Sequence, residues 1–153
     1  MSDEVQNQNN HQNLIAEIEN KIQFLVMIAI FFPAVMYYFF NIYDRSNADK
    51  VALSYVGIVA AYLVNYIFFE TFKSKIKTNI LKKINFLALI GISTFLLPVI
   101  YLSLIVTQPS ALLFMMQILF KISLCGLMIV PILLFIMILW PLVFCGKITF
   151  WRR

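Results

Sequence analysis

One lysine, Lys121, lies inside the otherwise apolar stretch SALLFMMQILFKISLCGLMIV at 110–130. A charge inside a membrane-spanning segment costs free energy, so such residues usually bind a substrate, relay a proton or line an ion pathway. Lys121 is therefore the first candidate for chemistry in this chain. What it can do depends on where the surrounding helix crosses the bilayer.

The apolar run around Lys121, residues 111–145, is too long for one membrane crossing. As a straight helix it would measure about 52 Å, against a hydrocarbon core of roughly 30 Å. The favoured interpretation is a span at 123–145, which ends beside Lys147 and leaves Lys121 at the outer interface. There its apolar stem lets the ammonium group reach the lipid headgroups. Residues 111–120 then form an interfacial, re-entrant or protruding apolar helix.

Two other placements of this run remain open. A span at 111–131 puts Lys121 near the bilayer midplane, at a cost of about 2.5–3.5 kcal/mol, and leaves the apolar stretch 132–144 without a role. Two short spans joined near 126–131 would place the basic C-terminus outside, against the positive-inside rule.

The remaining ionisable and metal-binding side chains argue against catalysis. The only histidine, His11, lies in a polar leader, which excludes haem ligation and histidine-based metal sites within the membrane. No predicted span contains Asp or Glu, whereas proton-coupled exporters need an embedded carboxylate. Cys125 and Cys145 would lie about 30 Å apart along a helix, too far for a disulfide. We therefore expect a chain that is not an enzyme, with no catalytic residue, metal site or cofactor.

Composition places the chain in a membrane. Hydrophobic residues make up 62% and charged residues 12% of the sequence, against roughly 45–50% and 25% in ordinary globular proteins. The apolar runs do not alternate with polar residues, as the strands of a barrel would. The sequence predicts an all-α integral membrane protein, a four-transmembrane-helix bundle in one domain (14–153), with spans at about 22–43, 51–69, 84–106 and 123–145.

The first thirteen residues, MSDEVQNQNNHQN, are rich in Asn and Gln. They hold too few apolar groups to offset the cost of ordering, so we expect 1–13 to be a disordered tail. Asn13 is a candidate N-cap for a helix whose apolar residues recur at helical spacing. The leader is acidic rather than basic, so the first span is expected to be retained rather than cleaved as a signal peptide.

Lysine and arginine set the expected orientation. The connection 70–83 holds five lysines, and the segment after Cys145 holds Lys147, Arg152 and Arg153, whereas the link 107–110 holds none. The positive-inside rule therefore predicts a cytoplasmic N-terminus and a cytoplasmic C-terminus. Short loops and the lack of sorting or N-glycosylation signals favour the bacterial cytoplasmic (inner) membrane.

The second span carries small and polar residues on one helical face: Ser54, Gly57, Ala61 and Asn65. Small residues let helix backbones approach closely, and an amide in lipid needs a hydrogen-bond partner on another helix. The face predicts helix packing, either within the chain or with another membrane protein.

The basic connection is expected to contact lipid headgroups through its five lysines, namely Lys73, Lys75, Lys77, Lys82 and Lys83. Although the net charge is +5, the basic residues lie between apolar runs rather than on an aromatic-rich basic face. We therefore expect membrane lipids as partners and no nucleic acid.

These features favour a non-enzymatic accessory, assembly or immunity-type subunit that binds another membrane protein, or a second copy of itself, through helix packing. The alternative is a small transporter or channel that uses Lys121 as an anion-binding or gating charge.

Overall fold

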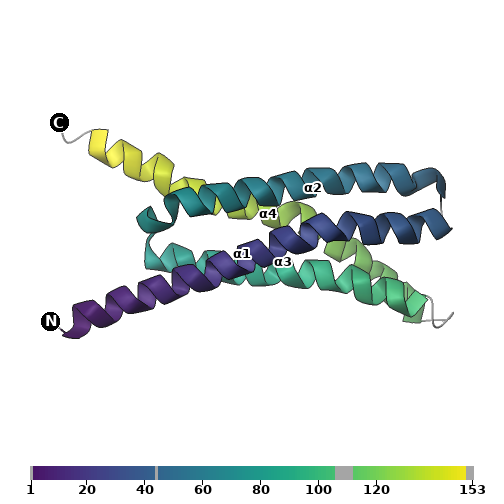
Figure 1. The fold of residues 1–153 in the computed structure, drawn as a ribbon, viewed down its shortest axis with the longest axis horizontal. Helices are drawn as coiled ribbons and strands as arrows, with labels where there is room; N and C mark the ends of the chain where they lie inside the picture. Colours follow the sequence, from purple (N-terminus) through teal and green to yellow (C-terminus); the bar gives the residue numbers. More distant parts are fainter. Residues whose placement is uncertain (1, 44, 106–111, 151–153) are drawn as a thin grey trace.

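The computed structural model describes residues 2–43, 45–105 and 112–150, and within them the chain is helical apart from one short connection (Figure 1). The elements are α1 (Ser2–Tyr43), α2 (Arg45–Phe72), the 3₁₀ turn η1 (Lys73–Lys75), α3 (Thr78–Ile105) and α4 (Leu112–Phe150). Each of the four α-helices contains a segment long and apolar enough to cross a membrane. The predicted all-helical class with four such helices is confirmed.

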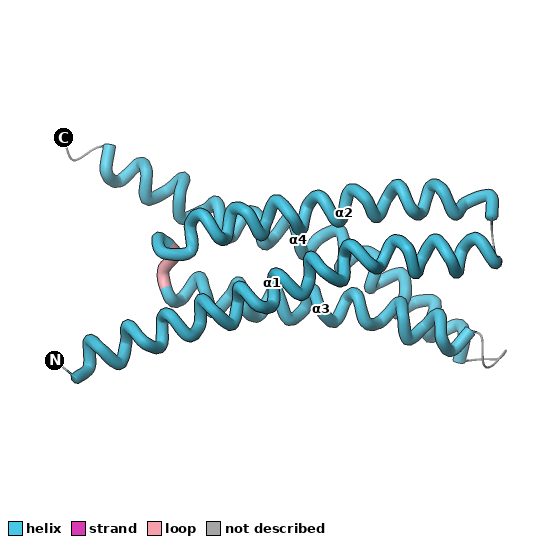
Figure 2. The backbone as a smooth tube through the Cα atoms, viewed as in Figure 1, coloured by secondary structure: helices cyan, strands magenta, loops and turns pink. Residues whose placement is uncertain are grey.

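The four helices form a ring in which each packs on two neighbours. α1 packs against α2 and α3, and α4 packs against α3 and α2. The η1 turn lies at the same end of the bundle as the marked N- and C-termini (Figure 2). We call this end, which holds η1, the connection end.

Every helix buries one stripe of side chains at alternating three- and four-residue spacing. On α1 the stripe is Ile18, Ile22, Leu25, Ala29, Phe32 and Met36; on α2 it is Tyr55, Ile58, Tyr62, Asn65 and Phe69. The α3 stripe includes Leu81, Ile84, Ala88 and Phe95, and the α4 stripe includes Ser123, Leu127, Val130, Leu134 and Ile138. This spacing keeps one seam of each helix facing its partners, as in left-handed bundles.

The outward faces are as apolar as the buried ones. Leu53 and Phe31, for example, are 74% and 69% exposed. A water-soluble bundle of this size would carry charged side chains there. An apolar exterior fits a bundle whose solvent is lipid.

Helices α3 and α4 approach each other closely at Gly126. The Ser123 hydroxyl on α4 donates a hydrogen bond to the Thr94 carbonyl, and the Thr94 hydroxyl donates to the Gly91 carbonyl. A Cβ atom added at Gly126 would overlap the Thr94 methyl group. Glycine at 126 therefore allows the α3 and α4 backbones to meet, as small residues do at membrane helix interfaces.

The helix boundaries differ from the sequence prediction at the N-terminus. Residues 2–13, expected as a disordered tail, form the first turns of α1. No proline or glycine occurs before Pro33, so nothing stops the helix that starts around Leu14 from extending backwards, and each added residue gains a hydrogen bond.

Two predicted connections are also shorter than expected. α2 begins at Arg45, and the basic connection 70–83 is non-α-helical only between Phe72 and Thr78. The link 107–110 and the predicted end of the third span at residue 106 lie outside the described residues.

The long apolar run is one helix, α4, of 39 residues that continues through Pro131 and Pro141. The helix has no turn near 126–131, where the hairpin alternative would need one, and residues 112–120 are continuous with the last helix. Within the described part of α4, residues Gln117–Pro141 are long and apolar enough to cross a membrane, and the predicted span 123–145 overlaps this segment.

Replacing Gly126 by alanine is expected to destabilise the bundle by about 1–3 kcal/mol, the usual cost of overpacking. Thr94 cannot turn its methyl away cheaply, because its hydroxyl is bonded to Gly91. Thermal unfolding in mild detergent measures the loss.

The control is Gly57→Ala, since no described atom would lie within 4 Å of the new methyl. Thr94→Ser removes the overlapping methyl but keeps the hydroxyl, so it should rescue Gly126→Ala. Equal stability of Gly126→Ala and Gly57→Ala would contradict this account of the α3–α4 contact.

Candidate functional site

The predicted packing face of α2 lies beside the face that α2 actually buries. The buried stripe runs through Tyr55, Ile58 and Tyr62, whereas Ser54 and Gly57, one position earlier, are exposed. Of the four residues singled out in the sequence, only Asn65 belongs to the buried stripe. A shift of one residue rotates a helix face by about 100°, so the predicted face is the flank of the packed surface.

Asn65 ties α2 to α4. Its side chain is 1% exposed, and its Nδ2 donates to the carbonyls of Ala61 and Pro131, each at 2.9 Å. The second bond crosses between helices, as expected for an amide in a membrane bundle. The intramolecular packing role predicted for Asn65 is present. Its Oδ1, however, is buried without a hydrogen-bond partner among the described atoms.

The other end of this face is uncovered. Ser54 is exposed and its hydroxyl bonds to the Lys50 carbonyl of its own helix. Within the described structure, a Cβ atom built at Gly57 would meet nothing within 4 Å. α4 therefore covers the face at Asn65 and leaves it open two turns away.

Between these ends lies a groove of about 340 Å³ between α2 and α4. Ala60, Ala61 and Val64 form one wall and Pro131, Ile132 and Phe135 the other, with Asn65 at the base. Apart from Asn65 the lining side chains are all apolar. We call the surface formed by Ser54, Gly57, Ala61 and this groove the α2 flank.

Two buried tyrosines on α2 also have unpartnered polar atoms. The hydroxyls of Tyr55 and Tyr62 form no hydrogen bond to any described atom. Their rings pack on Phe32 and Phe95, with centroids 4.9 Å and 5.5 Å apart respectively. A buried hydroxyl without a partner costs about 1–3 kcal/mol, so aromatic packing holds these residues in place.

Lys121 lies on the exposed surface of α4. The preceding residue, Phe120, stacks on Tyr101 of α3 with ring centroids 4.8 Å apart. Tyr101 lies four residues, or about 6 Å, before the end of α3. Lys121 thus lies near the level of Tyr101, nine residues, or about 13 Å, after the start of α4 at Leu112.

A network of polar side chains at the connection end was not anticipated from the sequence. Lys21 of α1 contacts Glu17 at 2.6 Å and the Asn85 amide oxygen of α3 at 2.7 Å. The Asn85 amide nitrogen donates to Glu17 at 3.1 Å, which closes the triad. The sequence signal was the Glu17–Lys21 spacing of four residues, but nothing in the sequence indicated Asn85 as its third member.

A second triad joins α1 to the start of η1. Lys73 contacts Glu19 of α1 at 3.1 Å and Glu70 of α2 at 2.7 Å. Lys73, one of the five lysines predicted to contact lipid headgroups, is paired with two carboxylates. Both triads anchor the α1 helix beside the α2–α3 connection.

The other predicted lipid-contacting lysines are free of carboxylates among the described side chains. Lys75 lies 5.9 Å from the centroid of the Phe72 ring, in a cation–π arrangement. Lys77, Lys82 and Lys83 are exposed. Because only Lys73 of the five lysines is paired with described carboxylates, most of the positive charge of this connection is available to an external anion.

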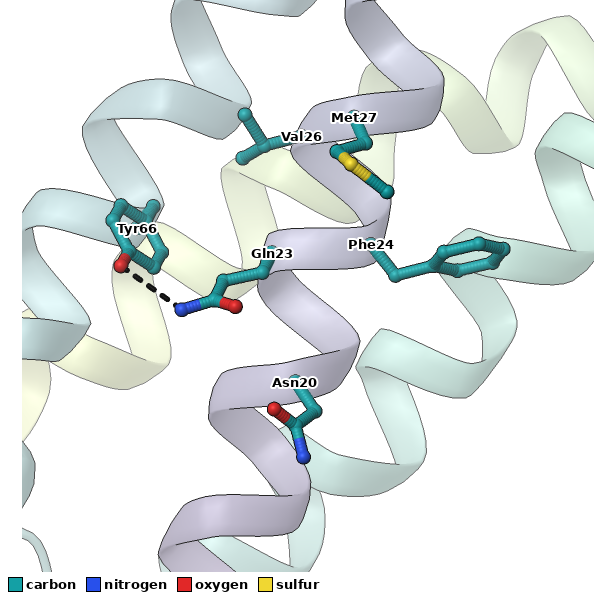
Figure 3. A pocket seen from close by; sticks show the side chains of 6 residues that line it. All are labelled: Asn20, Gln23, Phe24, Val26, Met27 and Tyr66. Carbon is teal, nitrogen blue, oxygen red and sulfur yellow. Dashed lines mark hydrogen bonds between the residues drawn. The ribbon is translucent and has the colours of Figure 1, made fainter.

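A shallow hollow of about 440 Å³ lies where α1 faces α2 (Figure 3). The Gln23 amide donates to the Tyr66 hydroxyl across the two helices at 3.1 Å, beside Asn20, Phe24 and Met27. The two polar groups satisfy each other, which is a structural role. No three His, Cys, Asp or Glu side chains within the described residues come together as a metal site.

Comparison of the chain with protein families, with curated proteins and with solved structures finds no match.

Removing the Asn65 amide is expected to weaken the α2–α4 contact. Asn65→Ala should lower stability by about 0.6–1.7 kcal/mol, the range measured for hydrogen bonds between membrane helices. Ser54→Ala, which loses a bond only to its own helix, is the control and should be near neutral. Thermal unfolding in detergent that gives the same value for both variants would contradict the interhelical role of Asn65.

Removing Lys73 is expected to loosen the N-terminal half of α1, because Glu19 and Glu70 would then face each other without a cation. Hydrogen exchange of the α1 backbone around Glu19 should rise in Lys73→Gln by at most about fivefold, since partly exposed ion pairs are worth roughly 0.2–1 kcal/mol. Lys75→Gln removes the same charge without touching a carboxylate. Equal exchange in the two variants would show that the triad does not hold α1.

Proposed function

We propose that this chain is a non-enzymatic multi-pass membrane protein, of the bacterial cytoplasmic membrane, that acts as an accessory, assembly or immunity-type subunit. It binds a transmembrane helix of another membrane protein on its α2 flank. The observation that carries this proposal is the open space around Gly57, which lies on a helix face suited to close packing.

Shape supports a helical partner. The α2 flank offers small residues at Ser54, Gly57 and Ala61, followed by the apolar groove against α4. A helix laid along this line would pack on backbone rather than on long side chains, which is the favourable geometry in lipid. The uncovered length spans about two turns of α2.

Hydrogen bonding does not distinguish a different protein from a second copy. Asn65 lines the groove, but its side chain is 1% exposed, its Oδ1 is buried and its Nδ2 already bonds two carbonyls. A helix laid on the groove therefore cannot reach this acceptor, and the proposal depends on the shape of the α2 flank.

The described polar core supports a binding role rather than catalysis. The buried polar side chains other than tyrosine are Asn65, Thr94 and Ser123, and each donates to a backbone carbonyl. Asn65 and Ser123 bond across helices, and the Thr94 hydroxyl bonds within its own helix. None is paired with a base or an acid as a nucleophile would be.

The position of Lys121 favours a boundary charge over an internal binding charge. Its exposure on α4 suits an ammonium whose apolar stem lets it reach the headgroups. The transporter alternative requires Lys121 to face a water-filled path, and loss of transport in Lys121→Met with intact assembly would revive it.

Gly57→Leu is expected to reduce recovery of the partner at least about tenfold in a mild-detergent pull-down from the native membrane, because a leucine side chain blocks close helix approach. The bundle itself should keep its unfolding temperature, as nothing described lies near Gly57. Ala34→Leu, an equal change on the exposed face of α1, is the matched control.

Full recovery of the partner with Gly57→Leu would contradict docking on the α2 flank. Recovery of nothing except additional copies of this chain would replace the proposed partner with a homo-oligomer.

A further inference from the structure

We propose that the connection end holds a binding groove for the phosphate of an anionic phospholipid, formed between the N-terminal turns of α1 and the η1–α3 junction. This inference goes beyond the partner proposed for the α2 flank and depends only on the chain lying in a membrane. It gives residues 7–15 of α1 a function that the sequence did not suggest.

The groove has a volume of about 510 Å³. His11 from α1, Ser74 from η1 and Thr78 at the start of α3 line it, together with the amide side chains of Asn7, Gln8 and Gln12. The hydroxyl and amide groups can donate hydrogen bonds, and no carboxylate is among the described residues that line the groove. Such a lining suits a ligand that only accepts, as an ionised phosphate diester does.

Two contacts hold α1, which forms one wall of the groove, against the η1–α3 junction. His11 Nε2 lies 3.4 Å from the Ile76 carbonyl, which can only accept, so this nitrogen carries the hydrogen. The Glu19–Lys73 ion pair fixes the same two segments two turns further along α1. Helix α1 is therefore positioned to close the groove even though its first residues are polar.

The surrounding charge favours an anion. Ser74 and Thr78 alternate with Lys75 and Lys77 in the sequence SKIKT, and Lys82 and Lys83 follow on α3. Three described carboxylates of this end are already paired: Glu17 with Lys21, and Glu19 and Glu70 with Lys73. Unpaired basic residues near a membrane surface attract anionic lipid by about 1 kcal/mol each, over about a Debye length.

The depth of the groove favours a lipid as the source of the phosphate. Ser74 follows the predicted end of the second span at residue 69, and Thr78 precedes the predicted start of the third at residue 84. Both positions therefore lie within roughly 10 Å of the hydrocarbon, at headgroup level. Ile15 adds one apolar side chain to the lining, suited to the glycerol end of a lipid.

Native mass spectrometry of the full chain in mild detergent tests the proposal, with phosphatidylglycerol and phosphatidylcholine as probes. The intact chain should retain phosphatidylglycerol in preference to phosphatidylcholine. The double variant Ser74→Ala/Thr78→Val keeps every charge and should lose about tenfold in affinity for phosphatidylglycerol, as charge-assisted hydrogen bonds are lost. The pair Lys82→Gln/Lys83→Gln, outside the groove, should weaken binding less.

The outcomes separate the groove from simple electrostatic attraction. If Lys82→Gln/Lys83→Gln weakens binding and Ser74→Ala/Thr78→Val does not, the lipid is attracted by a diffuse basic surface and the proposed groove is wrong. If inorganic phosphate displaces phosphatidylglycerol at comparable concentration, the site takes free phosphate and the lipid assignment is wrong. An unchanged unfolding temperature in Ser74→Ala/Thr78→Val shows that lost binding is not lost folding, and His11→Ala gives an independent variant of the α1 wall.

Discussion

The position of α4 depends on the close approach of its backbone to α3 at Gly126, and the accessible surfaces of the bundle depend on α4. In hydrocarbon, apolar side chains gain nothing by leaving lipid for another helix, so close packing and interhelical hydrogen bonds must hold the helices together. Gly126 against Thr94 and Ser123 against the Thr94 carbonyl hold the first half of α4 to α3. Further along, Pro131 meets Asn65 of α2. Helix α4 crosses from α3 to α2 (Figure 1). It meets α2 at Asn65, whereas a Cβ atom at Gly57 would meet no described atom within 4 Å.

Helix number and approximate position could be read from the sequence, because hydrocarbon thickness imposes a minimum length of apolar residues. Which face of each helix is buried could not be read from the sequence. In a soluble protein polarity marks the outside of each helix, but here Phe31 and Phe32 are both phenylalanine, one exposed and one buried. The small residues on α2 pointed to a packing face that is offset by one position from Tyr55, Ile58 and Tyr62. Large aromatic side chains, not small ones, fill the centre of this bundle.

At the connection end, sequence-based prediction failed for a different reason. Composition suggested that an Asn- and Gln-rich leader would not order, since it buries little apolar surface. In the structure the leader continues the helix of the apolar part of α1, and His11 contacts the carbonyl of Ile76, 65 residues further along the chain. No local pattern carries that information. Likewise, five lysines look equivalent in the sequence, and only the fold distinguishes Lys73, which is neutralised, from the other four.

The alternating three- and four-residue stripes have a consequence for how such a sequence can change over evolutionary time. A one-residue insertion in the middle of α2 would leave its length and hydropathy almost unaltered, and the helix would still enter the bilayer. It would nevertheless rotate every later side chain by about 100°, turning Asn65 and Phe69 away from their neighbours and toward lipid. Substitutions that exchange one apolar residue for another of similar volume would pass on every face. Insertions and deletions within the helices would not be tolerated, even though they leave the hydrophobicity of the segment unchanged.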